Sequence, residues 1–423
     1  MSKRTDPEPG KKVAIVGSGC AGLAALWALS RSPHDVYLYE ADSRLGGHSN
    51  TVEFVKGKYK VMVDTGFIVL NSATYPNFID FLKLMKVELE PTDMTFSVSR
   101  DQGWFEWSGS SVDALFCQRS NLMSPKMWRM IFDIIRFNYF ALDVLRRDSP
   151  TDETIGEYLE REGYSSAFRD DYLIPMTAAI WSTSPDKWNH HLLSTVSSRP
   201  QWLTIKDGSK TYIDKIMMGF PSNHVRLNTR VTRLISERDG RVRLHTHSGK
   251  SEVFDHVILA THGDQAYQII RDSATDEEHE ILRHFLTSKN VAVLHSDISL
   301  MPTSRKAWSA WNYLAKSSSP NLKKQTGNIT QVCLTYDMNA LQHIPRNIFG
   351  KVLVTINPLH EPDPTTVQGR YIYRHPLYTP AAVKAQRRLN EIQNKRGISY
   401  AGAWTGPIVV FVVEAIFTPG QTD

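Results

Sequence analysis

Three glycines near the start of the chain have the spacing of a phosphate-binding turn. Gly17, Gly19 and Gly22 follow the short apolar segment 13–16 and lead into the helix-favouring segment 23–29. In such a run the first glycine permits a tight turn, the second lets the backbone approach a pyrophosphate, and the third lets helix and strand pack closely. The free N–H groups at the start of the helix attract phosphate oxygens. We therefore predict a dinucleotide site formed by Gly17, Ser18, Gly19, Cys20, Ala21 and Gly22.

An acidic residue stands where a second strand ends. Residues 36–39 are strand-like, and Glu40 follows them at close to the roughly 20-residue spacing of the dinucleotide fold. A carboxylate at this position accepts hydrogen bonds from ribose hydroxyls and repels an additional 2′-phosphate. A glycine turn without a ligand is the alternative for the run alone. The order strand, helix, strand and acid favours the binding site.

The residues after Glu40 indicate which dinucleotide is bound. Residues 40–47 read Glu-x-x-x-Arg-x-Gly-Gly, and this extension resembles the flavin amine oxidase and phytoene desaturase superfamily. The first dinucleotide fold of that superfamily holds FAD, so the resemblance implies FAD as the cofactor. An arginine can bind phosphate with two hydrogen bonds, and paired glycines leave room for a cofactor against the backbone. The resemblance implies contacts along the pyrophosphate and ribityl chain from Ala41, Arg44, Gly46, Gly47 and His48.

Three later segments resemble other flavin-contacting parts of the superfamily. Residues 64–68 match a loop that returns to the flavin ring, residues 230–234 match the sheet under the adenosine, and residues 399–406 match the closing flavin motif. The alternatives are a plain glycine turn in the first segment and an ordinary buried valine in the second. The resemblance implies cofactor contacts from Gly66, Phe67, Val231, Gly402 and Thr405.

The resemblance covers nearly the whole chain after residue 12 and implies an α/β protein. A Rossmann-type FAD-binding domain, of the p-hydroxybenzoate hydroxylase and amine oxidase kind, would be interleaved with an α+β substrate domain. The narrower match is to a poorly characterised branch of predicted NAD/FAD-binding proteins that accompanies cyclopropane fatty acid synthases. We expect a disordered lead-in at 1–12, FAD-binding parts at 13–75 and 221–290, a mostly helical part of the substrate domain at 76–220, its sheet at 291–395, and a closing motif with a divergent tail at 396–423.

The composition is that of an ordinary globular protein. Apolar residues make up 41% of the chain and charged residues 22%. The net charge of +5 is small, and no block of basic residues indicates nucleic-acid binding. The cysteines Cys20, Cys117 and Cys333 are too few and too scattered for a metal cluster, so we expect no metal. We also expect a cytoplasmic protein, because no apolar run approaches the roughly 20 residues that span a bilayer and residues 1–12 lack a signal-peptide core.

Residues 126–147 combine basic residues with aromatic and aliphatic ones at a helical spacing. One interpretation is a peripheral membrane or lipid-access helix, with its arginines toward anionic headgroups. The other, which we favour, is a core helix of the substrate domain with a solvated basic edge. A similar choice applies to Trp308, Trp311 and Tyr313, which could form aromatic walls for an apolar substrate or plain core.

The chain carries a single Gly-x-Gly-x-x-Gly run, whereas a reductase with its own NAD(P)H domain would usually have a second. We therefore expect hydride transfer to flavin from a carbon of a small molecule, with reoxidation by oxygen or another acceptor. The resemblance to the branch that accompanies cyclopropane fatty acid synthases implies an apolar substrate, fatty-acyl or lipid in kind. A flavin amine oxidase is the alternative. A flavin-free or inactive protein is the third hypothesis, because residues 407–413 depart from the family's Gly-rich continuation. No catalytic residue is assigned, since we expect Lys206, Lys210 and His262 to be solvated.

Overall fold

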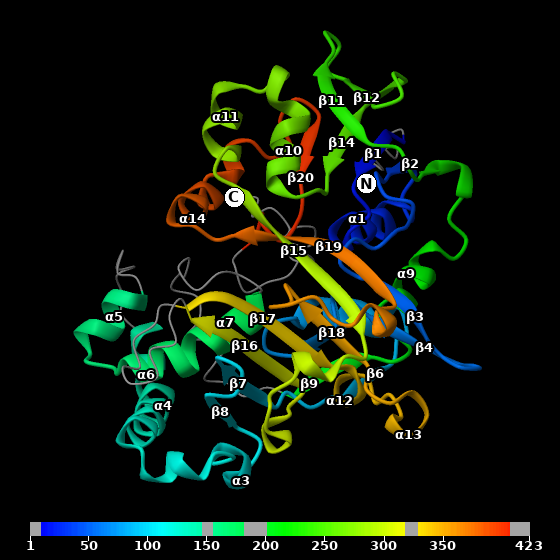
Figure 1. Cartoon of the computed structure of the whole chain (residues 1–423). Coiled ribbons are helices and arrows are strands. Elements are labelled where there is room, and N and C mark those ends of the chain that lie inside the picture. The colour runs from blue at the N-terminus through cyan, green and yellow to red at the C-terminus, as the bar shows by residue number, and fades with distance from the viewer. Residues whose placement is uncertain (1–9, 146–154, 182–200, 318–328, 407–423) are drawn as a thin grey trace, which may run out of the picture.

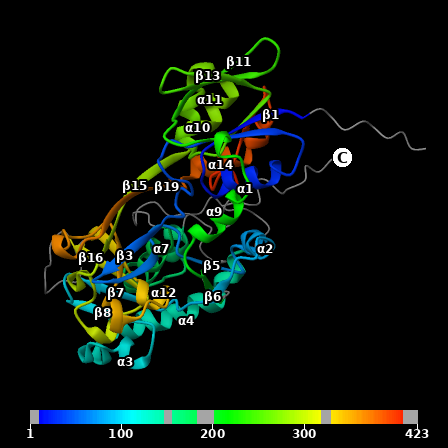
Figure 2. The same cartoon turned by 90° about the vertical axis from the view of Figure 1, so that its right-hand side faces the viewer.

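Two lobes joined by a pair of long strands make up the protein (Figure 1). The computed structural model describes residues 10–145, 155–181, 201–317 and 329–406. One lobe is built on a parallel sheet and the other on a larger mixed sheet, and the view from the side separates them clearly (Figure 2). The antiparallel pair β15 (Leu286–His295) and β19 (Gly369–Leu377) runs from one lobe into the other.

The parallel sheet has five strands in the order β10-β2-β1-β14-β20, and all four pairings are parallel. Alternate residues of its central strand point to opposite faces. Ala14 and Val16 pack on the face covered by helices α10, α11 and α14, while Ile15 packs on the face covered by α1, α2 and α9. The elements are β1 (Lys12–Val16), β2 (Asp35–Tyr39), β10 (Val225–Arg226), β14 (His256–Leu259), β20 (Ile398–Tyr400), α1 (Cys20–Leu29), α2 (Pro76–Leu84), α9 (Lys210–Met217), α10 (Gly263–Ile270), α11 (Asp276–Leu282) and α14 (Pro380–Arg387).

A small antiparallel sheet packs on the first of these faces. It consists of β11 (Val231–Ser236), β12 (Val242–Thr246) and β13 (Ser251–Phe254) in sequence order. Leu234, Leu244 and Phe254 are fully buried in the same cluster as the central strand. A parallel sheet of this order with a small meander beside it confirms the predicted Rossmann-type α/β fold.

The mixed sheet has seven strands in the order β19-β15-β18-β17-β16-β7-β8. It takes β7 and β8 from the segment 76–220, for which we expected mostly helices, and its strand β15 begins at Leu286, before the expected boundary at residue 291. Trp311 and Tyr313 lie in its core with 6% and 1% of their surfaces exposed, so plain core packing is the correct interpretation for both. The remaining strands are β7 (Phe96–Arg100), β8 (Phe105–Ser108), β16 (Trp311–Ser317), β17 (Ile329–Asp337) and β18 (Leu353–Ile356).

Short strands connect the two large sheets. Asp64, at the end of β4, accepts hydrogen bonds from the Thr51 hydroxyl (2.6 Å) and from the hydroxyl of Ser209 just before α9 (2.7 Å). These bonds fix the loop that follows β4. The connecting elements are the hairpin β3 (Thr51–Lys56) and β4 (Tyr59–Asp64), and the three-stranded sheet of β5 (Val69–Asn71), β6 (Leu89–Pro91) and β9 (Trp202–Ile205).

Helices line the outer side of the mixed sheet. The helix predicted at 126–147 is α4 (Pro125–Leu145), and residues 146–154 lie outside the described part of the chain. One face of α4 is in the core, where Met127, Met130 and Phe137 are at most 2% exposed. The other helices and short turns here are α3 (Val112–Leu115), α5 (Ile155–Arg161), α6 (Ser166–Phe168), α7 (Ile174–Trp181), α12 (Met338–Leu341) and α13 (Arg346–Phe349).

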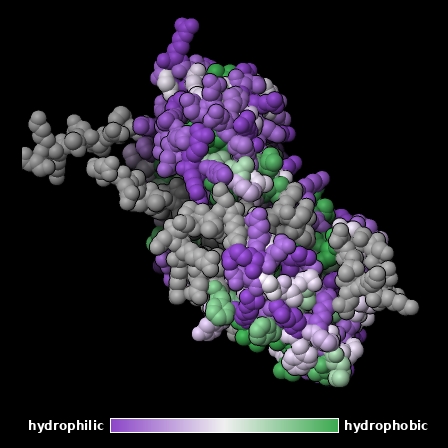
Figure 3. All heavy atoms as spheres, turned by 90° about the vertical axis from the view of Figure 1, so that its left-hand side faces the viewer, coloured by the Kyte–Doolittle hydropathy of each residue, from purple (hydrophilic) through white to green (hydrophobic). Residues whose placement is uncertain are grey.

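The solvated edge of α4 differs from the expected one. Arg129, whose side chain is 48% exposed, pairs with Asp133 at 3.0 Å, and the partly buried Arg136 stacks over the Tyr164 ring at 4.4 Å. Apart from Arg129, the exposed edge is apolar among the described residues of α4, and Figure 3 shows apolar side chains on this lobe. Among the described residues, no helix is long and apolar enough to cross a membrane. The edge consists of Trp128 (51% exposed), Phe132 (58%), Ile135 (65%) and Tyr139 (78%).

Candidate functional site

The predicted phosphate turn lies where the carboxyl ends of parallel strands meet. It follows β1, and Gly17 adopts a φ of +101° that side chains disfavour. A Cβ added to Gly17 would lie 2.6 Å from the carbonyl oxygen of Ala260, just after β14. A Cβ added to Gly22 would lie 1.8 Å from the carbonyl oxygen of Gly17. Gly17 and Gly22 are therefore required by the turn itself and by close packing. Ligands of open α/β sheets bind at this edge, where the strand order reverses.

Gly19 has no such internal reason to be glycine. It caps the N-terminus of α1 with φ −62° and ψ 176°, which any residue can adopt. A Cβ added there would meet no atom within 4 Å. Space above this backbone, next to the free N–H groups of a helix start, is what an approaching pyrophosphate needs.

Glu40 is bonded to the turn. Its Oε2 accepts hydrogen bonds from the backbone N–H (2.8 Å) and the hydroxyl of Ser18, and its Oε1 accepts one from the Asp42 N–H (2.9 Å). Glu40 therefore positions the turn, a role that the sequence pattern did not predict, and its contact with ribose stays a prediction. Its carbonyl also accepts the N–H of Thr229 at 2.8 Å, which brings the start of β11 and the buried Val231 near this edge.

The second glycine pair lies against the first turn. The N–H of Gly46 donates to the carbonyl of Ser18 at 3.0 Å, and a Cβ added to Gly47 would lie 3.2 Å from the Cα of Gly19. Arg44 braces this loop through a hydrogen bond from Nη2 to the carbonyl of Gly47 (2.7 Å). Contacts of Arg44 and of the exposed Ala41 with a phosphate stay predictions.

The other predicted segments converge on the same place. A Cβ added to Gly66 would lie 2.3 Å from the carbonyl of His48, which also accepts the N–H of Phe67 at 2.8 Å. At the closing motif, the Thr405 hydroxyl donates to the carbonyl of Gly402 at 2.9 Å. The Trp404 indole donates to the carbonyl of Thr261, which follows β14. The divergent tail at 407–423 lies outside the described residues.

The residues that we expected to be solvated have different surroundings, and so does Cys20. Lys206 and Lys210 are exposed and paired with Glu88 and Asp214, as expected for solvated lysines. Burial raises the pKa of the Cys20 thiol to about 12, so this cysteine packs beside the turn as an unreactive thiol. His262 was expected on a solvated surface, but it is partly buried and its ring lies 5.7 Å from that of His48.

His262 belongs to a cluster of three histidines beside the turn. Their rings are close: 5.1 Å between the centroids of His48 and His375, and 5.7 Å between those of His48 and His262. Tyr373 packs edge-on against His48 at 5.1 Å, and its hydroxyl accepts a hydrogen bond from the amide of Asn50 at 3.0 Å. The sequence analysis did not predict His375 and Tyr373 as site residues. The signal that could have indicated them was a histidine beside Pro376 in a strand-like run. Within the described residues, no group of three His, Cys, Asp or Glu side chains could hold a metal.

The histidines of this cluster are neutral at physiological pH. Burial, with a smaller contribution from the nearby His262, lowers the pKa of His375 to about 4. Burial also holds the pKa of His48 well below its usual range, with contributions from both other histidines and from Arg44. Burial lowers the pKa of His262 as well. The cluster therefore offers neutral donors and acceptors to a ligand rather than positive charge.

This cluster should make the protein acid-labile. Below about pH 6.5 the unfolded chain binds protons at these positions and the folded protein does not. The contribution of the histidines to the free energy of unfolding is therefore fully present above pH 6.5 and is lost as the pH falls toward 4. From His375 alone we expect a loss of about 2 kcal/mol in the free energy of unfolding between pH 7.5 and pH 5. Urea unfolding of wild type and His375→Gln at both pH values measures it. The variant should lose this part of the pH dependence, whereas the exposed-site control His247→Gln should keep it.

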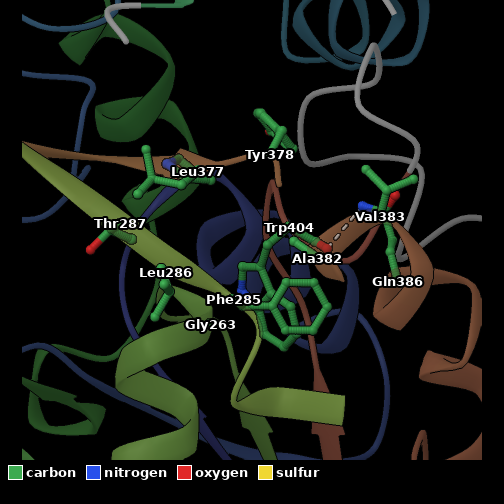
Figure 4. Close-up of a pocket in the computed structure, with 11 residues that line it drawn as sticks. Gly263, Phe285, Leu286, Thr287, Leu377, Tyr378, Ala382, Val383, Gln386 and Trp404 are labelled. Atoms are coloured by element: carbon green, nitrogen blue, oxygen red, sulfur yellow. Dashed lines mark hydrogen bonds between the residues drawn. The ribbon is translucent and has the colours of Figure 1, made fainter. Parts of the chain in front are cut away.

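An apolar pocket adjoins the cluster (Figure 4). Gly263 and Pro376, which follow His262 and His375 in the chain, both line it. Gln386 contributes a polar side chain, but its Nε2 already donates a hydrogen bond to the carbonyl of Trp404 at 3.0 Å. None of the lining residues is charged, and the larger apolar ones are Phe285, Leu286, Leu377, Tyr378, Val383 and Trp404.

Known structures share this fold over most of the chain. The CLA-producing fatty acid isomerase of P. acnes is 14% identical with a TM-score of 0.63, and the match covers 95% of each chain. The cyclohexylamine oxidase of Brevibacterium oxydans is 14% identical with a TM-score of 0.63 and covers 95% of this chain and 96% of that one. At these identities the likeness concerns the fold alone.

Two sequence relatives match short segments of the chain. The flavin-containing monooxygenase iboF of Amanita muscaria is 46% identical over 48 residues, and the L-amino-acid oxidase of Demansia vestigiata is 49% identical over 41 residues. These matches span 11% and 10% of this chain, and 9% and 8% of those proteins. The family model of flavin containing amine oxidoreductases matches residues 20–300. The chain therefore belongs to this family of FAD-dependent oxidoreductases.

Proposed function

We propose that this protein holds FAD at the edge formed by the phosphate turn and oxidises a carbon of an apolar small molecule. The observation that carries the cofactor site is Gly19, whose backbone is open although neither its dihedral angles nor its neighbours require glycine. When bound, FAD supplies the hydride acceptor, and oxygen or another acceptor restores its oxidised state.

Several segments of the chain would each contact a different part of the cofactor. The turn at 17–22 and the start of α1 would bind the pyrophosphate, and Glu40 would accept from the ribose. Arg44, Ala41 and the glycine pair would follow the pyrophosphate and ribityl chain. The adenine would meet the backbone at Val231. The remaining contacts would come from His48, Gly66, Phe67, Gly402 and Thr405.

The surroundings support an apolar substrate. The pocket beside the histidine cluster is lined by aromatic and aliphatic side chains and has no acidic lining residue that could pair with an ammonium group. A fatty-acyl chain fits this chemistry, and one structural neighbour is a fatty acid isomerase. A neutral amine is the second candidate because the histidines are uncharged and another neighbour is a cyclohexylamine oxidase.

The first test is the visible absorbance spectrum of protein purified with added FAD. About one equivalent of bound flavin is expected, and anaerobic addition of an unsaturated fatty acid should bleach it. Bleaching by cyclohexylamine, with none by fatty acids, would replace the proposed substrate with an amine. Folded protein that stays colourless would contradict the proposal and favour the flavin-free alternative.

A lipid contact through α4 and a cytoplasmic location stay predictions. The exposed apolar edge supports an apolar partner for α4, and the half-exposed Arg129 is a cation at this edge, although it already pairs with Asp133. Sedimentation with anionic vesicles decides this contact, and protein that stays in the supernatant would exclude it.

A further inference from the structure

A relay of side-chain amides ends on His375. The backbone N–H of Val291 donates to Oδ1 of Asn357 at 2.9 Å, and Nδ2 of Asn357 donates to Oδ1 of Asn290 at 2.7 Å. Nδ2 of Asn290 then lies 2.7 Å from Nδ1 of His375. A backbone N–H can only donate, so the atom that faces it must be the amide oxygen of Asn357, and this sets the orientation of both amides.

The relay determines where His375 carries its proton. Because an amide N–H faces Nδ1, this nitrogen must accept, and the proton of the neutral ring resides on Nε2. Protonation of Nδ1 would place two donors face to face, so the relay opposes the imidazolium form. His375 is thereby a neutral donor through Nε2 and is unsuited to act as a cationic acid. Among the described residues, none accepts a hydrogen bond from this Nε2.

A second observation indicates that the cluster faces a ligand. Nε2 of His48 is buried and has no hydrogen-bond partner among the described residues, which is costly for a polar atom inside a protein. His48 directly follows Gly47, which approaches Gly19 at the phosphate turn. The His375 ring lies 5.1 Å from the His48 ring. Polar groups of the cluster therefore lack protein partners beside the residues that would hold the cofactor.

We propose that Asn357 and Asn290 are positioning residues that present Nε2–H of His375 as a neutral hydrogen-bond donor to a ligand oxygen. This inference rests on the proposed FAD site. The ligand group is a carbonyl or carboxylate oxygen, which either the flavin ring or an acyl substrate can supply. A neutral donor stabilises such an oxygen without proton transfer, and the apolar surroundings strengthen the bond.

The proton position can be measured without flavin. In protein labelled with ¹⁵N-histidine, the signal lost in His375→Gln identifies His375, and wild type at pH 7 should show a protonated Nε2 and an unprotonated Nδ1. Asn290→Asp replaces the donor with an acceptor of equal size, so Nδ1 should become protonated and the pKa of His375 should rise. Asn223→Asp adds the same charge at an exposed site and should change neither the protonated nitrogen of His375 nor its pKa.

Two results would overturn the relay: a wild-type ring protonated on Nδ1, or a ring unchanged in Asn290→Asp. The ligand is identified by adding FAD and then decanoate while following the proton on Nε2. A downfield shift with FAD assigns the acceptor to the flavin, a shift only with decanoate assigns it to the substrate, and no shift with either refutes the donor role. Absorbance reports separately whether FAD is bound, so protein without flavin contradicts the proposed function while the ring measurement still tests the relay.

Discussion

Gly19→Ala is expected to lower the affinity for FAD by roughly 100-fold, which corresponds to about 3 kcal/mol, while leaving the fold intact. The added methyl group meets no protein atom within 4 Å and the backbone angles suit alanine, so the folded protein has room for it. It would occupy the space in which a pyrophosphate approaches the helix start. The loss of a preferred N-cap residue should cost the free energy of unfolding about 1 kcal/mol at most. Flavin fluorescence titration and urea unfolding measure the two effects.

Two other glycines make this experiment specific. Gly109→Ala adds a methyl group 3.9 Å from the nearest atom, the Trp107 ring in the other lobe, and should keep wild-type affinity. Gly22→Ala places a methyl group 1.8 Å from a backbone oxygen, so it should impair folding and not merely binding. Wild-type flavin affinity in Gly19→Ala would show that the open space is not a pyrophosphate site.

Asp171→Ala is expected to lower the free energy of unfolding by about 3–5 kcal/mol. Asp171 is fully buried and pairs with Arg100, whose side chain is 5% exposed, and with Lys126 at 2.9 Å. Its carbonyl also accepts the Trp107 indole at 3.0 Å. Removal of the carboxylate would leave the buried Arg100 guanidinium with Asp101, 4.0 Å from Nε, as its remaining anionic partner, and this is the main cost. Urea unfolding followed by circular dichroism measures the change.

The neighbouring Asp170 is the matched control. It pairs with Arg169 at 2.7 Å, but both side chains are partly exposed, at 33% and 53%. Water replaces such a pair at little cost, so Asp170→Ala should lower the free energy of unfolding by less than about 1 kcal/mol. Equal losses for Asp170→Ala and Asp171→Ala would mean that burial of the Arg100 pair does not hold the helices on the mixed sheet.

The exposed edge of α4 illustrates a limit of reasoning from periodicity. The spacing of apolar residues predicted a core helix with a basic solvated edge, and the core face is correct. The solvated edge retains Arg129, whose side chain is 48% exposed, but Arg136 packs on the Tyr164 ring and the other exposed residues described in α4 are apolar. Which of two faces of a helix is covered depends on neighbours that the local pattern does not contain.

The sequence by itself determined the Rossmann-type fold, because strand, turn, helix and acid follow one another within residues 12–40 and each obeys local rules of backbone and packing. It also indicated the segments that meet at the phosphate turn. Only the tertiary structure decided that Glu40 fixes this turn, since its partner is Ser18.

The histidine cluster likewise required the tertiary structure. His48 and His375 are distant in sequence, and the pairing of β15 with β19 brings His375 and Asn290 together. A side chain acquires a lowered pKa and a defined proton position only when it is desolvated and bonded by such distant partners.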